Sequence, residues 1–329
     1  MAKKKNNNDT LKYLRVSPVS RKMAKKKNNN NTLKYLRVSP VSNVCFSAIF
    51  IILALLCFMP ALLVLIVSLS DESSVLAKGY SYFPNKLSIA SYAYLARQWR
   101  YIGRAFLNSI GITVIGTGIG LIMCSTMGYA VSRPNYRLKG FFTWFIFIPM
   151  LFSGGLVASY MINTGILGLK NTYWALILPM CCSSFYIIIM RTFFQTTVPD
   201  AIIESAKIDG AAQMRIFIQI VLPISLPSIA TIGLFYTFAY WNDWMMAKYY
   251  LTSNVQDLFP LQYVLISLEN NIEFLSRNSQ FMAPGESSNV PSETIRMAMV
   301  MIAVIPIACS YPFFQKYFIS GLTIGAVKG

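Results

Sequence analysis

Six long intervals without a charged residue constrain this chain more than any other feature of its sequence. Marking every Asp, Glu, Lys and Arg leaves uncharged intervals at residues 38–70, 105–132, 140–169, 171–190, 216–242 and 297–315. A helix needs about 20 mostly apolar residues to cross the hydrocarbon core of a bilayer. Only 12% of the residues are charged, against roughly 25% in soluble domains. The sequence therefore predicts an all-α membrane protein with six transmembrane helices.

The placement of basic residues predicts the orientation of these helices. An even number of spans puts both termini on the same side of the membrane. The first 43 residues hold twelve of the 29 Lys and Arg residues, and the 133–139 loop holds three more with no acid. The 243–296 loop instead has six acids against three bases. Because Lys and Arg gather on the cytoplasmic side, we expect a multi-pass protein of the cell membrane with both termini cytoplasmic.

Two regions follow from composition: a basic, low-complexity tail at residues 1–43 and a transmembrane domain at residues 44–329. Met1–Ser20 recurs at Met23–Ser42 with one difference. A tandem duplication explains this repeat, and so does an artefact, in which case translation begins at Met23. We expect the tail to be disordered. The net charge of +17 does not indicate nucleic-acid binding, because most of it lies in this tail without interleaved aromatic residues. Contact with the lipid bilayer fits better.

Residue usage also argues against chemistry inside this chain. Histidine is absent, the six cysteines fall within the predicted spans without metal-ligand spacing, and the twelve carboxylates lie almost wholly in loops. We therefore expect no metal site, no cofactor and no enzymatic activity. None of the six intervals contains a charged residue, whereas ion-coupled carriers tend to place such residues within the membrane. The energy for any transport is expected to enter from outside the bilayer.

The loop between the fourth and fifth intervals carries a short amphipathic helix, predicted at about residues 198–210. Thr197 is expected to cap its start, with Pro199 in the first turn and Asp200 three residues after the cap. Gly210 suits the left-handed position that ends a helix. Small residues beside single acids on such a helix suit insertion into a cleft of a partner protein. An ordinary interfacial helix lying on the bilayer is the alternative.

Three further patterns concern the spans themselves. Pro223 and Pro227 predict a kink at the start of the fifth span. Gly154-Gly155 is consistent with either a helix break or close packing in the third. Small residues at every second position of the second span indicate helix packing rather than a phosphate-binding loop: Gly116, Gly118 and Gly120.

The loop motif carries a family resemblance. Glu204-Ser205-Ala206 followed by Asp209-Gly210-Ala211, and then by Pro223, resembles the EAA loop of permease subunits of ABC importers, with Ser205 where the family usually has Ala. The resemblance covers roughly residues 44–329 and continues in order through Leu107-Asn108-Ser109, Tyr129-Ala130-Val131-Ser132-Arg133, Pro149-Met150, Gly154-Gly155, Ile189-Met190-Arg191-Thr192-Phe193-Phe194, Tyr240-Trp241-Asn242-Asp243-Trp244 and the ending Phe314 to Gly329. It is most similar to oligosaccharide permeases of the maltose-type class, in the complex or multiple-sugar branch.

This resemblance implies the architecture of an ABC type I importer permease. Such a subunit pairs with a homologous second permease, sits on a cytoplasmic ATPase dimer that binds ATP and Mg²⁺, and receives oligosaccharide from an extracellular binding protein. Alternating access is driven by the ATPase. The residues that would contact the ATPase are Glu204, Ser205, Ala206, Asp209, Gly210 and Ala211. An ABC permease for a non-sugar solute, or a secondary carrier, is the alternative.

Two further sets of residues receive candidate roles. The resemblance places the C-terminal tail at the ATPase interface, namely Gly325, Ala326, Val327, Lys328 and Gly329, although short Gly-rich ends are commonly disordered. Aromatic rings near the outer end of the fifth span suit a sugar pathway, or else an interfacial aromatic belt; the candidates are Tyr240, Trp241, Asn242 and Trp244, near Tyr236. The polar, acidic loop at 245–294 is expected to meet the binding protein.

Overall fold

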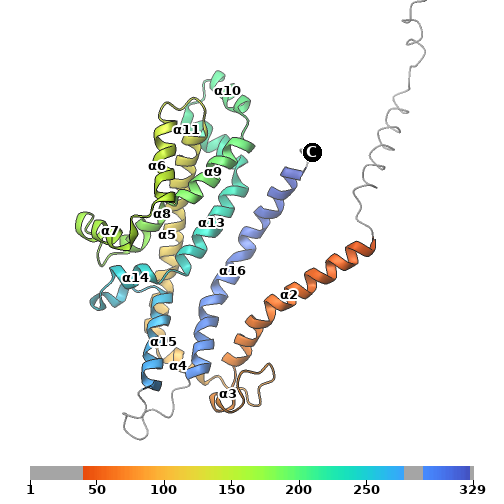
Figure 1. Cartoon of the computed structure of the whole chain (residues 1–329), viewed down its shortest axis with the longest axis vertical. Coiled ribbons are helices and arrows are strands. Elements are labelled where there is room, and N and C mark those ends of the chain that lie inside the picture. The colour runs from red at the N-terminus through yellow and green to blue at the C-terminus, as the bar shows by residue number, and fades with distance from the viewer. Residues whose placement is uncertain (1–39, 278–291, 327–329) are drawn as a thin grey trace, which may run out of the picture. The chain divides into compact units, whose positions relative to one another are not determined.

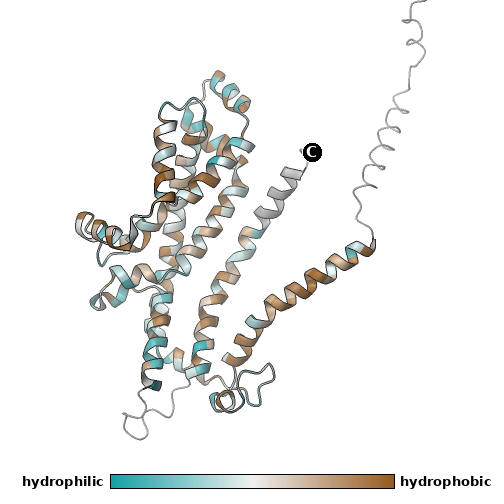
Figure 2. Cartoon of the chain, viewed as in Figure 1, coloured by the Kyte–Doolittle hydropathy of each residue, from teal (hydrophilic) through white to brown (hydrophobic). Residues whose placement is uncertain are grey.

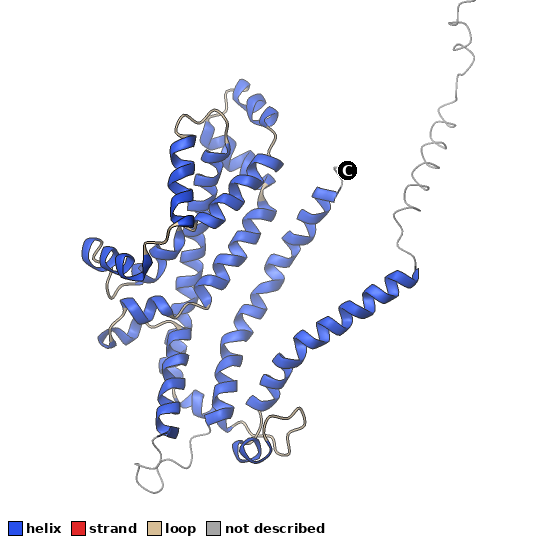
Figure 3. Cartoon of the chain, viewed as in Figure 1, coloured by secondary structure: helices blue, strands red, loops and turns tan. Residues whose placement is uncertain are grey.

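The computed structural model describes residues 40–277 and 292–326. Regular structure in these residues is helical (Figure 3), and their β-structure is limited to an isolated antiparallel bridge between Ser70 and Leu87. The predicted all-α class is confirmed. The chain divides into two units, residues 1–62 and 63–329, which are taken separately. Residues 1–39 of the predicted tail lie outside the described residues.

The first unit is described from residue 40 onward, where it consists of the greater part of helix α2 (Pro40–Ser68). This 29-residue helix contains Pro60 and no charged residue. Most of it is coloured brown, that is, hydrophobic (Figure 2), and such a predominantly apolar helix is typical of one surrounded by lipid or by other apolar helices. Helix α2 starts at Pro40, within the uncharged interval 38–70.

The second unit holds the remaining helices (Figure 1). In chain order they are α3 (Glu72–Lys78), α4 (Ala90–Arg97), α5 (Trp99–Ser132), α6 (Lys139–Leu151), α7 (Gly155–Met161), the π-helix η2 (Ile162–Ile166), α8 (Tyr173–Cys181), α9 (Ser184–Thr197), α10 (Asp200–Ile208), α11 (Gln213–Ile216), the π-helix η3 (Phe217–Val221), α12 (Leu222–Ile224), α13 (Leu226–Trp241), α14 (Met245–Tyr250), the 3₁₀ helix η4 (Ser253–Leu258), α15 (Leu261–Arg277) and α16 (Ser292–Ala326).

All six predicted intervals are helical, but they differ in continuity. Among the described residues, α2, α5 and α16 are each long and apolar enough to cross a membrane unbroken. The α8–α9 pair is bent by 46° and the α11–α13 run by 81°, and each of these reaches spanning length as a pair. The second bend lies at Ser225, between Pro223 and Pro227, as predicted.

The third interval departs from the prediction of six full spans. Its helix α6 has only 13 residues and contains Pro149. The chain then leaves helical geometry at Phe152, and Gly155 takes a left-handed φ of 79° at the start of α7. A left-handed residue cannot continue a right-handed helix. Gly154-Gly155 therefore marks a helix break, and by length and composition the described residues give three unbroken spans, or up to five if each bent pair counts as one span.

Helix α5 is the centre of the second unit and packs against α8, α9 and α13. Its glycines admit two tyrosine rings from α13: a Cβ at Gly116 would lie 2.6 Å from the ring of Tyr240, and one at Gly120 would lie 2.8 Å from that of Tyr236. Gly118 faces open space. The packing pair is thus spaced four residues apart, the interval that lies on one face of a helix, rather than the every-second-residue spacing expected.

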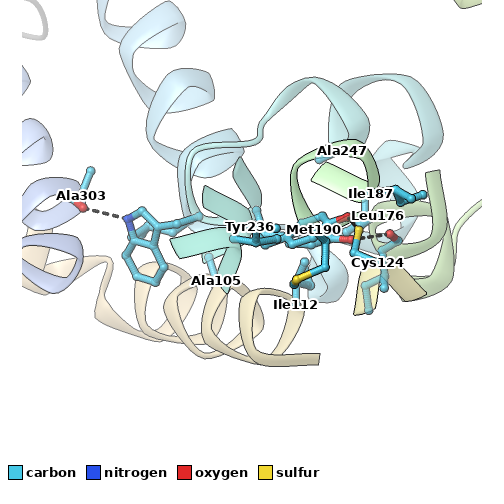
Figure 4. Close-up of a cluster of buried hydrophobic side chains, with 14 of the residues drawn as sticks. Ala105, Ile112, Cys124, Leu176, Ile187, Met190, Tyr236, Ala247 and Ala303 are labelled. Atoms are coloured by element: carbon cyan, nitrogen blue, oxygen red, sulfur yellow. Dashed lines mark hydrogen bonds between the residues drawn. The ribbon is translucent and has the colours of Figure 1, made fainter. Parts of the chain in front are cut away.

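The same tyrosines satisfy the polar backbone of α8. The Tyr236 hydroxyl donates to the carbonyl of Cys181 at 2.8 Å and lies 3.0 Å from Cys124 Sγ. Tyr240 donates to the carbonyl of Ile177 at 2.8 Å. Figure 4 shows Tyr236 close to Met190 and Cys124 within the buried cluster. Because Cys181 is the last residue of α8, its carbonyl has no continuing helix to bond, and the tyrosine supplies the missing donor.

One carboxylate, that of Glu72, holds the start of α16. Glu72 of α3 accepts hydrogen bonds from the first backbone N–H groups of α16, at 3.0 Å from Ser292 and 2.9 Å from both Glu293 and Thr294. Thr294 is also bonded by Ser91 of α4 at 2.7 Å. An acid suits this position because a helix N-terminus has unpaired N–H groups and positive potential. Glu72 therefore joins α3 and α16 across 220 residues of sequence.

Candidate functional site

Helix α10 projects at one end of the second unit, between α9 and α11 (Figure 1, top). Its nine residues fall within the range predicted for the loop helix. Asp200 lies in the first turn and Lys207 in the last, and both complement the helix dipole. Ile203 and Ala206, three residues apart, are buried against the rest of the unit. The helix is therefore seated on the bundle by one narrow face, and its other faces are left free.

The start of α10 differs from the prediction. Thr197 is the last residue of α9, and the residue that precedes α10 is Pro199, in extended geometry and with no side-chain cap. The expected capping box is therefore wrong. The physical reason is Pro199 itself, because a residue before proline avoids helical geometry. Val198 is accordingly extended, so the chain breaks between α9 and α10.

The end of α10 follows the prediction closely. Gly210 has a φ of 78°, and its N–H donates to the carbonyl of Lys207 at 3.0 Å. The N–H of Ala211 donates to the carbonyl of Ala206 at 2.9 Å. These two bonds make a Schellman motif, in which a left-handed glycine reverses the chain and satisfies the last carbonyls. Gly210 thus sets the direction in which the chain leaves α10.

The predicted contact residues divide between the free and the buried faces. Glu204, Ser205, Asp209 and Gly210 are exposed. Ala206 faces inward and Ala211 is half-buried. Within the described parts of the chain, no ion pair involves Glu204 or Asp209. The free face therefore presents two carboxylates beside small residues to whatever lies beyond the bundle.

The first turn of α10 is tied to the bundle through Arg133, the residue that directly follows α5. Its guanidinium pairs with the Asp200 carboxylate at 2.8 Å and donates to the carbonyl of Phe194 in α9, also at 2.8 Å. Its Nε donates to the Ser132 hydroxyl at 2.9 Å. The guanidinium carbon lies 5.3 Å from the centre of the Tyr129 ring. One arginine side chain thus joins the ends of α5 and α9 to the beginning of α10.

The chain after α10 is tied to the same place. Gln213, the first residue of α11, donates from Nε2 to the Tyr129 hydroxyl at 2.7 Å. The Tyr129 ring also packs edge-on against Phe194 and, at a tilt, against Phe217, with centroid separations of 5.9 and 5.1 Å. Tyr129 and Arg133 are four residues apart and so share one face of α5. Both ends of the loop helix therefore rest on a single turn of α5.

A cavity of about 320 Å³ lies behind α10, between the helix and the loop that follows α5. Its lining combines the α5 end, including Tyr129 and Arg133, with Asp200, Ile203 and Glu204 of α10. The lining is mostly apolar and carries charges of both signs. The cavity therefore separates one side of α10 from the loop that follows α5.

Comparison with known protein families gives the assignment. Residues 116–324 match the family described as "Binding-protein-dependent transport system inner membrane component". The chain belongs to this family. The matched range includes α10, the Arg133 contacts and the α5–α13 packing, so the geometry described above lies within the shared domain. Members are inner membrane permease subunits of transporters and are themselves non-catalytic. The predicted membrane location is confirmed.

Individual relatives are similar over nearly their whole length. The chain is 38% identical to "Polygalacturonan/rhamnogalacturonan transport system permease protein YtcP" of Bacillus subtilis (strain 168), over 84% of this chain and 94% of that protein. It is 27% identical to "Trehalose/maltose transport system permease protein MalG" of Thermococcus litoralis, over 85% and 94%. The resemblance to oligosaccharide permeases of the maltose-type class, stated from the motifs, is confirmed.

A solved structure supports the same conclusion. One chain of the "Crystal structure of a bacterial ABC transporter involved in the import of the acidic polysaccharide alginate" matches with a TM-score of 0.71 and 25% identity, covering 84% of this chain and 96% of that one. The chain, with its bent α8–α9 and α11–α13 segments, thus has the fold of an ABC importer permease.

The permease fold places the predicted sugar-pathway residues in different environments. Tyr240 is 3% exposed and Trp241 is 5% exposed. The indole of Trp241 donates to the carbonyl of Ala303 in α16 at 2.9 Å, drawn as a dashed line in Figure 4. Trp244 is half-buried under Lys248, whereas Asn242 is exposed. Tyr240 and Trp241 are therefore buried in the helix core, and a role for these four residues in a sugar pathway stays a prediction.

The outer end of α13 also carries a half-buried acid. Asp243 accepts a hydrogen bond from the backbone N–H of Met246 at 3.2 Å. Burial raises the pKa of the Asp243 carboxyl to about 6, and the backbone hydrogen bonds of Met246 and Met245 oppose this shift. The Asp243 carboxylate thus accepts from a backbone N–H in the first turn of α14, so the motif that ends α13 also helps to start α14.

The Leu107-Asn108-Ser109 motif has a structural role at the same end. Asn108 donates to the carbonyls of Asp257 and Phe259, at 2.7 and 3.1 Å. Ser109 accepts from the N–H of Leu261 at 2.7 Å. These bonds fix η4 and the start of α15 against α5. Part of the loop expected to meet a binding protein is therefore held rigidly.

At the C-terminus, helix α16 continues through Gly325 and Ala326. The other predicted tail residues, Val327, Lys328 and Gly329, lie outside the described residues.

Proposed function

We propose that this chain is the transmembrane subunit of an ATP-driven oligosaccharide importer, in which it supplies half of the translocation pathway. Family membership carries the permease assignment, and the names of the relatives carry the substrate class. The family match does not support the alternative of a secondary carrier. A non-sugar solute is also disfavoured, since the relatives cited above are named for saccharides.

The proposal extends to partners. A homologous second permease completes the pathway, a cytoplasmic ATPase dimer binds ATP and Mg²⁺, and an extracellular binding protein delivers the solute. No cofactor is expected in this chain itself. Its ATPase contact is the free face of α10, with Glu204 as the polar anchor and Ser205, Asp209 and Gly210 beside it; Ala206 and Ala211 seat the helix. Gly325, Ala326, Val327, Lys328 and Gly329 are proposed to take part in the same ATPase interface. This assignment is supported by exposed carboxylates on a helix that is itself firmly seated.

Acidic oligosaccharides are the first candidates for the solute. Polygalacturonan is a polymer of a uronic acid, and the similar solved transporter is described as involved in the import of the acidic polysaccharide alginate. Helix α10 lies at the opposite end of the second unit from α15 (Figure 1). The described part of the chain therefore gives no reason to place the choice of solute in α10. Specificity is expected to lie mainly with the binding protein and the second permease.

Uptake measurements test the proposal. The chain is co-expressed with its candidate partner permease, ATPase and binding protein, and uptake of labelled oligogalacturonides is compared with that of neutral maltooligosaccharides. Glu204→Ala is expected to reduce uptake at least about tenfold, because a charge-assisted contact contributes roughly 1.5–3 kcal/mol. Arg137→Ala, which removes an exposed charge from the loop that follows α5, serves as the control. Normal uptake in Glu204→Ala at an unchanged membrane level would refute the ATPase contact.

A further inference from the structure

The side chain of Arg133 is largely buried and contacts several groups at once. Its side chain is 12% exposed, whereas the carboxylate that it pairs with, Asp200, is 59% exposed. It meets three acceptors on α5, α9 and α10, and it lies over an aromatic ring. Because Asp200 is exposed, its ion pair with Arg133 contributes little to stability. Stabilisation by this ion pair alone therefore does not explain why Arg133 makes all of these contacts.

The chemistry of the contact requires arginine. A guanidinium offers five donors in a planar fork, whereas a lysine ammonium is a point charge on a flexible stem. The three acceptors belong to Ser132, Phe194 and Asp200, and a single guanidinium reaches all of them. The Phe194 carbonyl belongs to the last turn of α9, where a cation also interacts favourably with the helix dipole. Arg133 thus holds the end of α5, the last turn of α9 and the first turn of α10 in a fixed arrangement.

Neighbouring contacts make this corner stiff. A Cβ at Gly128 would lie 3.0 Å from Cβ of Met190 and 3.2 Å from the backbone nitrogen of Arg191, so α5 and α9 are in close backbone contact beside Arg133. Tyr129 packs on Phe194 and Phe217 and binds Gln213. The chain on either side of α10 is therefore clamped to one turn of α5, and α5 runs through the core to α13.

We propose that Arg133 is the positioning residue through which movement of α10 reaches the transmembrane helices. The inference rests on the proposed function, because it takes the partner ATPase to be what moves α10. When the ATPase displaces α10, the Arg133 contacts carry α5 and α9 with it as one body. Without Arg133, α10 still docks on the ATPase through its free face but tilts on the bundle, and ATP hydrolysis is separated from transport.

The test uses the whole complex, with both permeases, ATPase and binding protein, in proteoliposomes. Three quantities are measured: ATPase recovered with the chain, ATP hydrolysis, and oligosaccharide transported per ATP hydrolysed. For Arg133→Gln, the expected result is wild-type ATPase recovery and hydrolysis with transport per ATP lowered roughly tenfold, a typical size for coupling between sites. Arg133→Lys is expected to recover only part of the loss. Arg137→Gln, which changes an exposed arginine four residues later, is expected to behave as wild type.

Other outcomes are decisive in the opposite direction. Normal transport per ATP in Arg133→Gln would overturn the proposal, and so would loss of the ATPase at a normal membrane level, since Arg133 would then serve docking. If Arg133→Gln does not accumulate in the membrane, Asp200→Asn replaces it. That change removes the ion pair from its exposed side, and unaltered coupling in it would also overturn the proposal. Failure of the proposed function itself is distinguishable, because the wild-type complex would then transport no oligosaccharide.

Discussion

Placing one methyl group on Gly116 is expected to lower the free energy of unfolding by about 3 kcal/mol, near the upper end of the usual cost of overpacking. The new Cβ would lie 2.6–2.8 Å from three ring carbons of Tyr240, well inside contact distance. The ring has little freedom to move away, because it is 3% exposed and its hydroxyl is bonded to the carbonyl of Ile177. Gly116→Ala therefore separates α5 from α13, and heating in detergent followed by size-exclusion chromatography measures the loss.

A matched control lies two residues away on the same helix. A Cβ at Gly118 would have no other atom within 4 Å, so Gly118→Ala is expected to be neutral, or to stabilise by up to about 1 kcal/mol through helix propensity. Replacing the ring as well tests the cause. In a double-mutant cycle, Gly116→Ala with Tyr240→Leu should cost less than the sum of the single changes. Equal stability of Gly116→Ala and Gly118→Ala would contradict the packing described here.

Gly210→Pro is expected to abolish uptake while the chain still reaches the membrane. Proline fixes φ near −65°, whereas Gly210 requires 78°, and it removes the N–H that donates to Lys207. The strained backbone and the lost hydrogen bond together cost about 2–4 kcal/mol. The Schellman turn cannot then form, so Gln213 is not returned to Tyr129 and α10 loses its seat. Oligosaccharide uptake and recovery of the ATPase with the chain are the measurements.

Gly168 provides the corresponding control at another site. It also has a positive φ, of 62°, and open space around it, but it lies in the loop between η2 and α8. Gly168→Pro imposes a comparable backbone change away from α10. Recovery of the ATPase is expected to be normal in Gly168→Pro and lost in Gly210→Pro. If both variants keep the ATPase, α10 is not its docking element.

Features carried by local sequence were predictable. The charge-free intervals locate the helices because an unpaired charge is costly in lipid. Gly210 ends α10 because glycine tolerates left-handed geometry, and Pro223 and Pro227 flank the point at which the chain bends by 81°. Each of these depends on a residue's own backbone or on its immediate neighbours. The Thr197 cap was also predicted from neighbouring residues, and it was wrong. Pro199 favours an extended residue before it, so Val198 is extended and the capping box does not form.

Features that depend on distant partners were not predictable in the same way. Arg133 and Asp200 are 67 residues apart, and no local pattern indicates their pairing. The i, i+4 spacing of Tyr129 and Arg133 was the available signal, but it gives only a shared face. The aromatic residues Tyr240 and Trp241 suggested a sugar pathway by type alone. Their burial results from Gly116 on α5 and from the carbonyl of Ala303 on α16, and these partners become visible only in three dimensions.

Cross-linking from α10 to the ATPase tests the central claim most directly. A single cysteine is introduced by Ser205→Cys on the exposed face of α10, in a variant whose exposed native cysteines, Cys45, Cys57, Cys182 and Cys309, are replaced by alanine. A control variant carries Asn270→Cys, exposed on α15 at the opposite end of the unit (Figure 1). A short bifunctional maleimide in membranes is expected to join the ATPase to residue 205 and not to residue 270. Cross-linking from residue 270 alone, or none from residue 205 in a complex that transports, would contradict the assignment of α10 as the ATPase contact.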